Sequence, residues 1–114
     1  MTEEQRIFAG KLFASEVPEL VEKKTRAHRL SQQFNALPET DEQRQAILTQ
    51  LLGTVGEGTR MLGPIHFHYG CHTRIGSGCF MNFNFTVQDD ACVTIGDHCN
   101  FGPNATIVTP LHPM

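Results

Sequence analysis

The sequence of 114 residues lacks several features that would point to common classes of protein. Its four cysteines contain no Cys-x-x-Cys pair, which argues against a zinc ribbon or a thioredoxin-like site. Lysine and arginine number nine against twelve acidic residues, and the net charge of −3 argues against a nucleic-acid partner, whose phosphates favour a basic face. No apolar run approaches the roughly 20 residues that a membrane-spanning helix needs. The polar N-terminus has no signal-peptide core, so we predict a cytoplasmic protein with reduced cysteines.

A six-residue repeat is the strongest positive signal. Large apolar residues stand at every sixth position, with one slip of two residues, at Ile75, Met81, Val87, Ile95, Phe101 and Ile107. The fourth residue after each of these is small or apolar: Cys79, Phe85, Ala91, Cys99, Ala105 and Leu111. A period of six is typical of a parallel β-helix, in which each segment forms one flat side of a three-sided coil. The pattern predicts that the six large residues line the interior of a prism.

The residues before Gly53 have helical spacing instead. We predict a first short helix over 2–10, a second helix that begins near Pro18, and a third that a capping box at Thr40 and Gln43 introduces. A basic run over 23–29 is interpreted as the solvated face of the second helix. The predicted fold is therefore mainly β with an α N-terminus: about three helices over 1–53, then a β-helix over 54–114.

The visible repeat supplies only about two coils, because each coil needs three segments. Stacked-repeat folds generally need at least three repeats to bury a continuous core. The slip falls at 89–94, where we expect the chain to bulge outward from a corner. The chain ends soon after His112, in mid-pattern, and we expect it to be truncated at its C-terminus.

Short motifs along the chain resemble those of one family, the maltose and galactoside O-acetyltransferases, a branch of the hexapeptide-repeat acyltransferases. They are AGKLF (9–13), FN (34–35), VGEG (55–58), YG (69–70), IG (75–76), NFN (82–84), DD (89–90), VTIGD (93–97), GPN (102–104) and HP (112–113). The resemblance implies a left-handed β-helix that works as a homotrimer. It further implies transfer of an acetyl group from acetyl-CoA to a sugar hydroxyl, with active sites between subunits and no metal.

The resemblance also assigns roles to three residues. His112 matches the family's catalytic histidine, a general base that takes the proton of the attacking hydroxyl; the alternative is an ordinary loop histidine before a proline. Asn82 matches an asparagine that stabilises the oxyanion; the alternative is a turn residue that bonds the backbone. Asp90 matches an aspartate that binds the acceptor sugar; the alternative is a solvated acid on a surface bulge.

Two further acceptor positions depart from the galactoside pattern. Ser15 stands where the family resemblance leads us to expect an aspartate, and His68 stands where we expect a serine. Both side chains still form hydrogen bonds with hydroxyl groups. The substitutions therefore leave the predicted fold unchanged, but they leave the identity of the acceptor open.

Two alternatives to an acetyltransferase remain at this point. His66, His68, Cys71 and His72 form a H-x-H-x-x-C-H motif with the ligand types of a zinc site, and a γ-carbonic-anhydrase-like trimer holds zinc with histidines on a similar fold. The second alternative is a non-catalytic fragment that keeps the family's fold but lacks the coils that contact acetyl-CoA.

Overall fold

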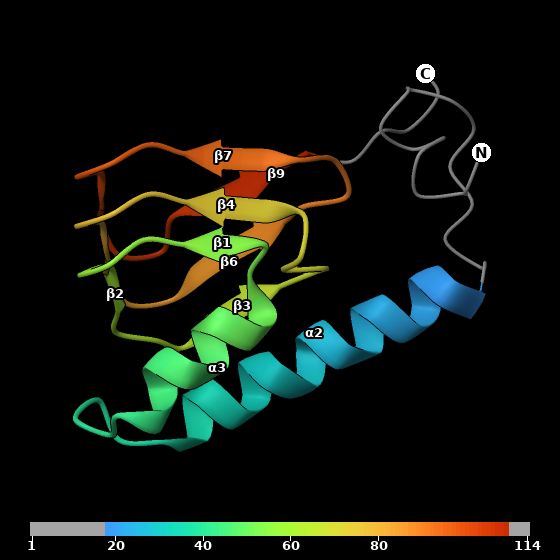
Figure 1. The fold of residues 1–114 in the computed structure, drawn as a ribbon, viewed down its shortest axis with the longest axis horizontal. Helices are drawn as coiled ribbons and strands as arrows, with labels where there is room; N and C mark the ends of the chain where they lie inside the picture. The colour runs from blue at the N-terminus through green and yellow to red at the C-terminus, as the bar shows by residue number, and fades with distance from the viewer. Residues whose placement is uncertain (1–17, 110–114) are drawn as a thin grey trace.

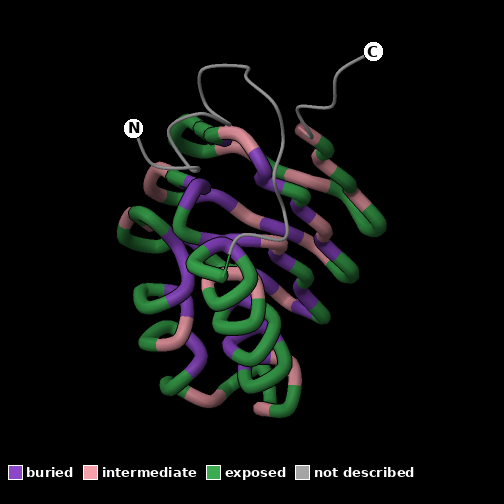
Figure 2. Tube along the Cα trace, turned by 90° about the vertical axis from the view of Figure 1, so that its right-hand side faces the viewer, coloured by how far each residue is buried: buried purple, intermediate pink, exposed green. Residues whose placement is uncertain are grey.

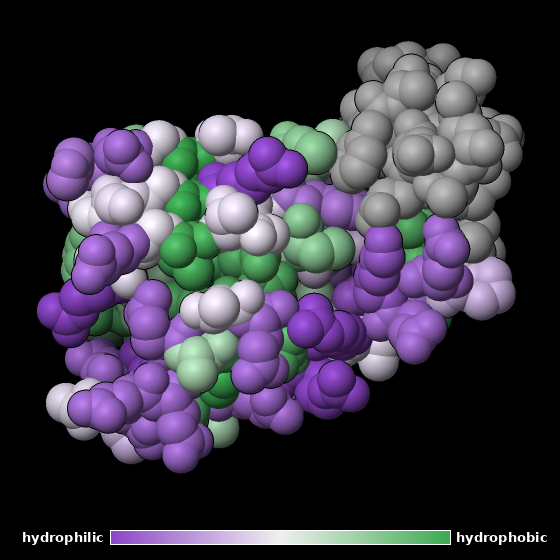
Figure 3. Space-filling view, viewed as in Figure 1, coloured by the Kyte–Doolittle hydropathy of each residue, from purple (hydrophilic) through white to green (hydrophobic). Residues whose placement is uncertain are grey.

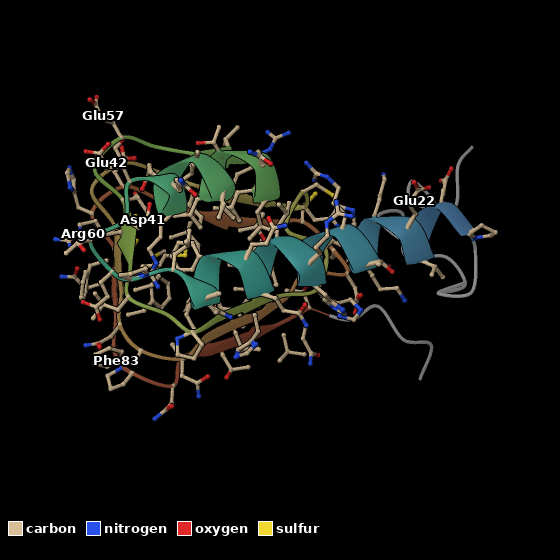
Figure 4. All side chains as sticks on the ribbon, turned by 90° about the horizontal axis from the view of Figure 1, so that it is seen from below. Glu22, Asp41, Glu42, Glu57, Arg60 and Phe83 are labelled. Atoms are coloured by element: carbon tan, nitrogen blue, oxygen red, sulfur yellow. The ribbon has the colours of Figure 1, made fainter. Side chains whose placement is uncertain are left out.

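Two helices support one end of the molecule. The computed structural model describes residues 18–109. Within this range α2 (Pro18–Ala36) and α3 (Gln43–Leu51) lie side by side below the strands (Figures 1 and 4). The described residues thus contain two helices rather than the predicted three, and the first predicted helix lies outside them. The predicted capping box is wrong: the N-cap Glu42 makes no side-chain bond, and the Gln43 amide donates to Asp41 Oδ1 at 2.8 Å.

Nine short strands follow the helices and wind as a parallel β-helix. They are β1 (Thr54–Val55), β2 (Arg60–Met61), β3 (Ile65–Phe67), β4 (Thr73–Ile75), β5 (Phe80–Met81), β6 (Phe85–Gln88), β7 (Val93–Ile95), β8 (Asn100–Phe101) and β9 (Thr106–Val108). Each of the strands β1 to β6 pairs in parallel with the third strand after it, which gives three sheets in the orders β1-β4-β7, β2-β5-β8 and β3-β6-β9. The three-sided coil that the six-residue period predicted is therefore confirmed.

The described prism contains three coils, and the prediction of about two was wrong. Paired residues such as Thr54 and Arg74, or Thr73 and Val93, lie 20 positions apart. A coil of this length consists of three six-residue segments plus a two-residue slip, and the slip occurs in both the first and the second coil. The first coil was missed because its glycines suggested a broken approach. Gly58 and Gly63 instead make its turns, with φ angles of 80° and 87° that L-residues rarely adopt.

The interior of the prism is apolar, as the repeat predicted. Figure 2 shows buried residues recurring along the coils. Ile75, Met81, Val87 and Ile95 are buried in one continuous core. Phe101 and Ile107 are only half-buried, because β8 and β9 are the last strands that the structure describes and each pairs on one side. Inward residues of successive coils therefore stack on one another, and the final layer is covered least.

The helices close the first coil from below. Ala27, Leu30 and Phe34 of α2, with Leu48 and Leu51 of α3, join the same core as the residues inside the prism. The opposite face of α2 is polar, and Figure 3 shows hydrophilic side chains over the helical part of the molecule. The amphipathic interpretation of the second helix is thus confirmed. In its basic run Arg26, His28 and Arg29 are exposed, whereas Lys23 and Lys24 are half-buried.

Arg44 ties both helices to the first coil. Its buried guanidinium lies 4.0 Å from the centroid of the Phe34 ring. The group donates from Nη2 to the Leu62 carbonyl at 2.9 Å, and from Nη1 and Nε to the carbonyls of Met61 and Phe34 at 3.4 Å. Burial lowers the pKa of Arg44, while the charges of Glu39 and Asp41 oppose this effect.

Candidate functional site

The corner between β6 and β7 is held inward by a buried carboxylate. Asp89 is fully buried, and its Oδ1 accepts the backbone N–H of Tyr69 at 2.7 Å. Its Oδ2 accepts the hydroxyl of Thr73, also at 2.7 Å. These bonds join the corner of the second coil to the corner of the first. The predicted outward bulge is therefore wrong at this residue, since the Asp89 side chain points into the protein.

Asp90 follows Asp89 directly, and its carboxylate is also buried but differs in its hydrogen-bond partners. The residue is only 5% exposed, which does not agree with a solvated acid on the surface. Its Oδ1 accepts no hydrogen bond from any residue within 18–109, and the nearest basic atom is His68 Nε2 at 3.6 Å. A buried polar atom that lacks a partner is unfavourable. A hydroxyl group of a bound ligand would supply the missing donor.

His68 stands between this carboxylate and α2. Its ring centroid lies 5.7 Å from that of His28 on α2 and 5.2 Å from that of Tyr69. Desolvation by burial lowers the pKa of His68 below its ordinary value of 6.5; Lys24 and His28 act in the same direction, while Asp90 and Asp89 oppose it. The imidazole is therefore neutral at pH 7 and offers one donor and one acceptor nitrogen.

A groove of about 370 Å³ begins at His68 and runs between α2 and the outer face of β3 and β6. The residues that line it include His28, Gln32, His66, His68, Thr86 and Gln88. Asn35 fixes the helix beside this face, because its side chain donates to the Ile65 carbonyl at 2.9 Å and accepts the Ile65 N–H at 2.7 Å. The unpaired edge of β3 is thus bonded to the helix rather than to solvent.

Asn82 lies at the corner that follows β5. Its Oδ1 accepts the N–H of Phe83 at 2.8 Å, so the predicted turn bond to the backbone is present. The NH₂ group of Asn82 bonds no other residue in the described part of the chain and remains available as a donor. Phe83 beside it is 51% exposed, and Figure 4 shows it away from the helices.

The structure brings together only some of the predicted site residues. His68 and Asp90 are adjacent, but Asn82 and Asp90 lie at opposite ends of β6. The four residues of this strand alone extend about 13 Å at roughly 3.3 Å per residue. Ser15 and His112 lie outside the described residues.

The H-x-H-x-x-C-H motif does not form a cluster. His66 lies on the exposed face of β3, whereas His72 is buried, stacked on Tyr69 at 4.4 Å. The Nδ1 atom of His72 lies 2.7 Å from the carbonyl oxygen of Asp89. Among residues 18–109, no group of three or more His, Cys, Asp or Glu side chains is placed to hold a metal ion.

Sequence reasoning missed Asp89 and the groove residues His28, Gln32 and Gln88. The 20-residue coil length is a signal for Gln88, because it pairs His66 with Thr86 and places β3 and β6 in one sheet. That length was hidden because only one slip was visible in the sequence. No signal in the sequence places His28 and Gln32 of α2 beside that sheet.

None of the described helices is both long and apolar enough to span a bilayer.

Comparison with known proteins agrees with this architecture. Residues 6–56 match the maltose acetyltransferase hexapeptide capping motif. The galactoside O-acetyltransferase of Escherichia coli (strain K12) is 39% identical over 111 residues, which cover 96% of this chain and 55% of the relative. The nodulation protein L of Rhizobium meliloti (strain 1021) is 34% identical over 113 residues, 98% of this chain and 62% of that protein.

Solved structures give the same result. A galactoside acetyltransferase in complex with coenzyme A superposes with a TM-score of 0.88 at 38% identity, over 95% of this chain and 55% of that one. A maltose O-acetyltransferase from Clostridium difficile 630 has a TM-score of 0.94 at 30% identity, over 100% of this chain and 62% of that one. The chain thus spans somewhat more than half the length of the proteins that it matches. In its motifs, its fold and these comparisons, the chain is similar to the maltose and galactoside O-acetyltransferases.

Proposed function

We propose that the protein transfers an acetyl group from acetyl-CoA to a hydroxyl group of a sugar. The observation that carries the proposal is the buried Asp90 carboxylate, whose Oδ1 lacks a donor and faces a half-buried His68. Such a pair suits a neutral ligand with two hydroxyl groups. One hydroxyl donates a hydrogen bond to Asp90, and the other forms a hydrogen bond with the neutral imidazole of His68. The relatives that are named galactoside and maltose O-acetyltransferases support the same chemistry.

His112 acts in this proposal as the general base. It accepts the proton of the acceptor hydroxyl while the oxygen attacks the thioester carbon of acetyl-CoA, and it returns the proton to the departing thiolate. The Asn82 NH₂ group donates to the oxyanion of the tetrahedral intermediate, a role typically worth about 3 kcal/mol. Asp90, His68 and Ser15 bind the remaining hydroxyl groups of the acceptor.

The separation of Asn82 and Asp90 supports an active site that two copies of the chain share. One small acceptor does not reach both side chains of the same copy, because the whole of β6 lies between them. We therefore propose a homotrimer of left-handed prisms, in which Asn82 of one copy meets Asp90 of its neighbour. A cytoplasmic location remains a prediction from the sequence.

Incubation with acetyl-CoA and a panel of sugars tests the proposed activity. We expect an acetylated sugar, detected by mass spectrometry, together with release of stoichiometric coenzyme A. Calorimetry with acetyl-CoA alone separates an enzyme from a non-catalytic fragment, since we expect micromolar binding. Failure to acetylate any sugar, with no acetyl-CoA binding, would reject the proposed function.

Mixing two inactive variants tests the shared site. We expect Asn82→Ala and Asp90→Ala proteins to be nearly inactive when each is assembled alone. Co-expression of the two variants is expected to restore part of the activity, because some mixed trimers contain an interface with both native residues. Sedimentation of each sample supplies the control for assembly. If the mixed sample were no more active than the two variants alone, Asn82 and Asp90 would not act across an interface.

A further inference from the structure

The groove between α2 and β3 has a direction that the helix–strand contacts define. His28 lies beside His68, the Ser31 hydroxyl lies 3.4 Å from the Phe67 amide nitrogen, and Asn35 bonds Ile65. The helix therefore runs antiparallel to β3, and the groove leads away from His68 and Asp90. From His28 to Asn35 the helix rises about 10 Å at 1.5 Å per residue. This length exceeds that of a single sugar ring.

The side chains along the groove are polar but bear no fixed charge. None of the described residues that line it is Asp, Glu, Lys or Arg. Phosphate groups of a nucleotide need cationic partners or helix N-termini, which this lining does not offer. Neutral amide, hydroxyl and imidazole groups instead suit a ligand rich in hydroxyl groups.

Several of these groups also have no partner of their own. The side chains of Gln32, His66, Thr86 and Gln88 bond no other residue in the described part of the chain. His66 and Thr86 are paired residues on neighbouring strands, and Gln88 lies two residues after Thr86 on the same face. Strand and helix therefore present open hydrogen-bonding groups from both sides of the groove.

We propose that this groove binds the sugar unit next to the one that is acetylated. The acceptor is then a disaccharide or a longer oligosaccharide, with its reacting unit at Asp90 and its next unit between Gln32 and His66. This inference rests on the proposed acetyl transfer and names the class of acceptor. His68 stands at the boundary between the two units, which gives a chemical reason for an imidazole at this position.

Binding of a matched saccharide series tests the inference without requiring catalysis. Calorimetry compares glucose with maltose and maltotriose, and galactose with lactose, on the wild type and on Gln32→Ala. We expect at least one disaccharide to bind about tenfold more tightly than its monosaccharide, the gain typical of one or two added hydrogen bonds. Gln32→Ala should remove that gain and leave the monosaccharide affinity unchanged.

The neighbouring residue supplies a matched control. Gln33 is also exposed on α2 but does not line the groove, so Gln33→Ala should change neither affinity. His66→Ala tests the strand side of the groove and should act like Gln32→Ala. Equal affinities for monosaccharides and disaccharides, or equal effects of Gln32→Ala and Gln33→Ala, would overturn the inference. Acetylation of monosaccharides without any length preference would refute the groove alone, whereas length-dependent binding without acetyl transfer would refute the proposed function alone.

Discussion

Replacement of His112 by alanine is expected to lower the turnover of the proposed acetyl transfer by about 10²-fold or more. A sugar hydroxyl is a poor nucleophile at neutral pH, and a positioned base typically accelerates such a step by about 10²–10⁴-fold. Binding of acetyl-CoA should change little, because the proposed role of His112 lies in the chemical step. Steady-state rates and calorimetry on the purified variant measure both quantities.

A second histidine provides the control for this experiment. His98 is exposed and adopts a φ of 57°, a left-handed conformation that asparagine also tolerates. His98→Asn should therefore keep both the fold and the turnover of the wild type. Near-normal turnover in His112→Ala would reject the role of His112 as the base, even if sugar acetylation itself is observed.

Replacement of Asp89 by alanine is expected to have the largest effect on stability. The change removes the acceptor for the Tyr69 amide and the Thr73 hydroxyl, both of them at a buried corner. Each buried donor left without a partner costs about 1–3 kcal/mol, so we expect a loss on the order of 3 kcal/mol. Urea denaturation, followed by circular dichroism, measures the free energy of unfolding.

The next residue in the chain is the matched control. Asp90→Ala removes a buried carboxylate with an oxygen that accepts no hydrogen bond from the described residues, so stability should be unchanged or higher. The same change should weaken acceptor binding by about tenfold or more, as expected for the loss of a hydrogen bond to a charged group. If both variants lost the same stability, the distinction between a structural Asp89 and a ligand-binding Asp90 would be wrong.

The sequence predicted the architecture better than its extent. The spacing of Ile75, Met81 and Val87 correctly indicated a prism, because burial of every sixth side chain leaves a clear apolar signal. Besides its glycines, a polar residue hid the first coil, because Thr59 stands at the fifth position of one of its segments. This threonine is buried because its hydroxyl donates to the Gly76 carbonyl at 2.6 Å and accepts the Cys79 N–H at 3.1 Å.

The candidate site was predictable only in part. Family motifs pointed to Asn82 and Asp90, but they did not indicate that Asp90 is buried while its neighbour Asp89 holds the corner. Adjacent carboxylates look alike in a sequence, and only the contacts of Tyr69 and Thr73 distinguish them. The groove was not predictable, because it depends on how α2 lies against β3.

The contact of α2 with the first strand of a sheet has a consequence for redesign. The helix packs on β3, whereas β9 forms the far edge of the same sheet (Figure 1). Lengthening the stack beyond β9 by whole 20-residue turns would leave the helix–strand cleft untouched. The proposed acceptor groove and the length of the prism are therefore separable variables, and an engineer can alter either of them while the other stays constant.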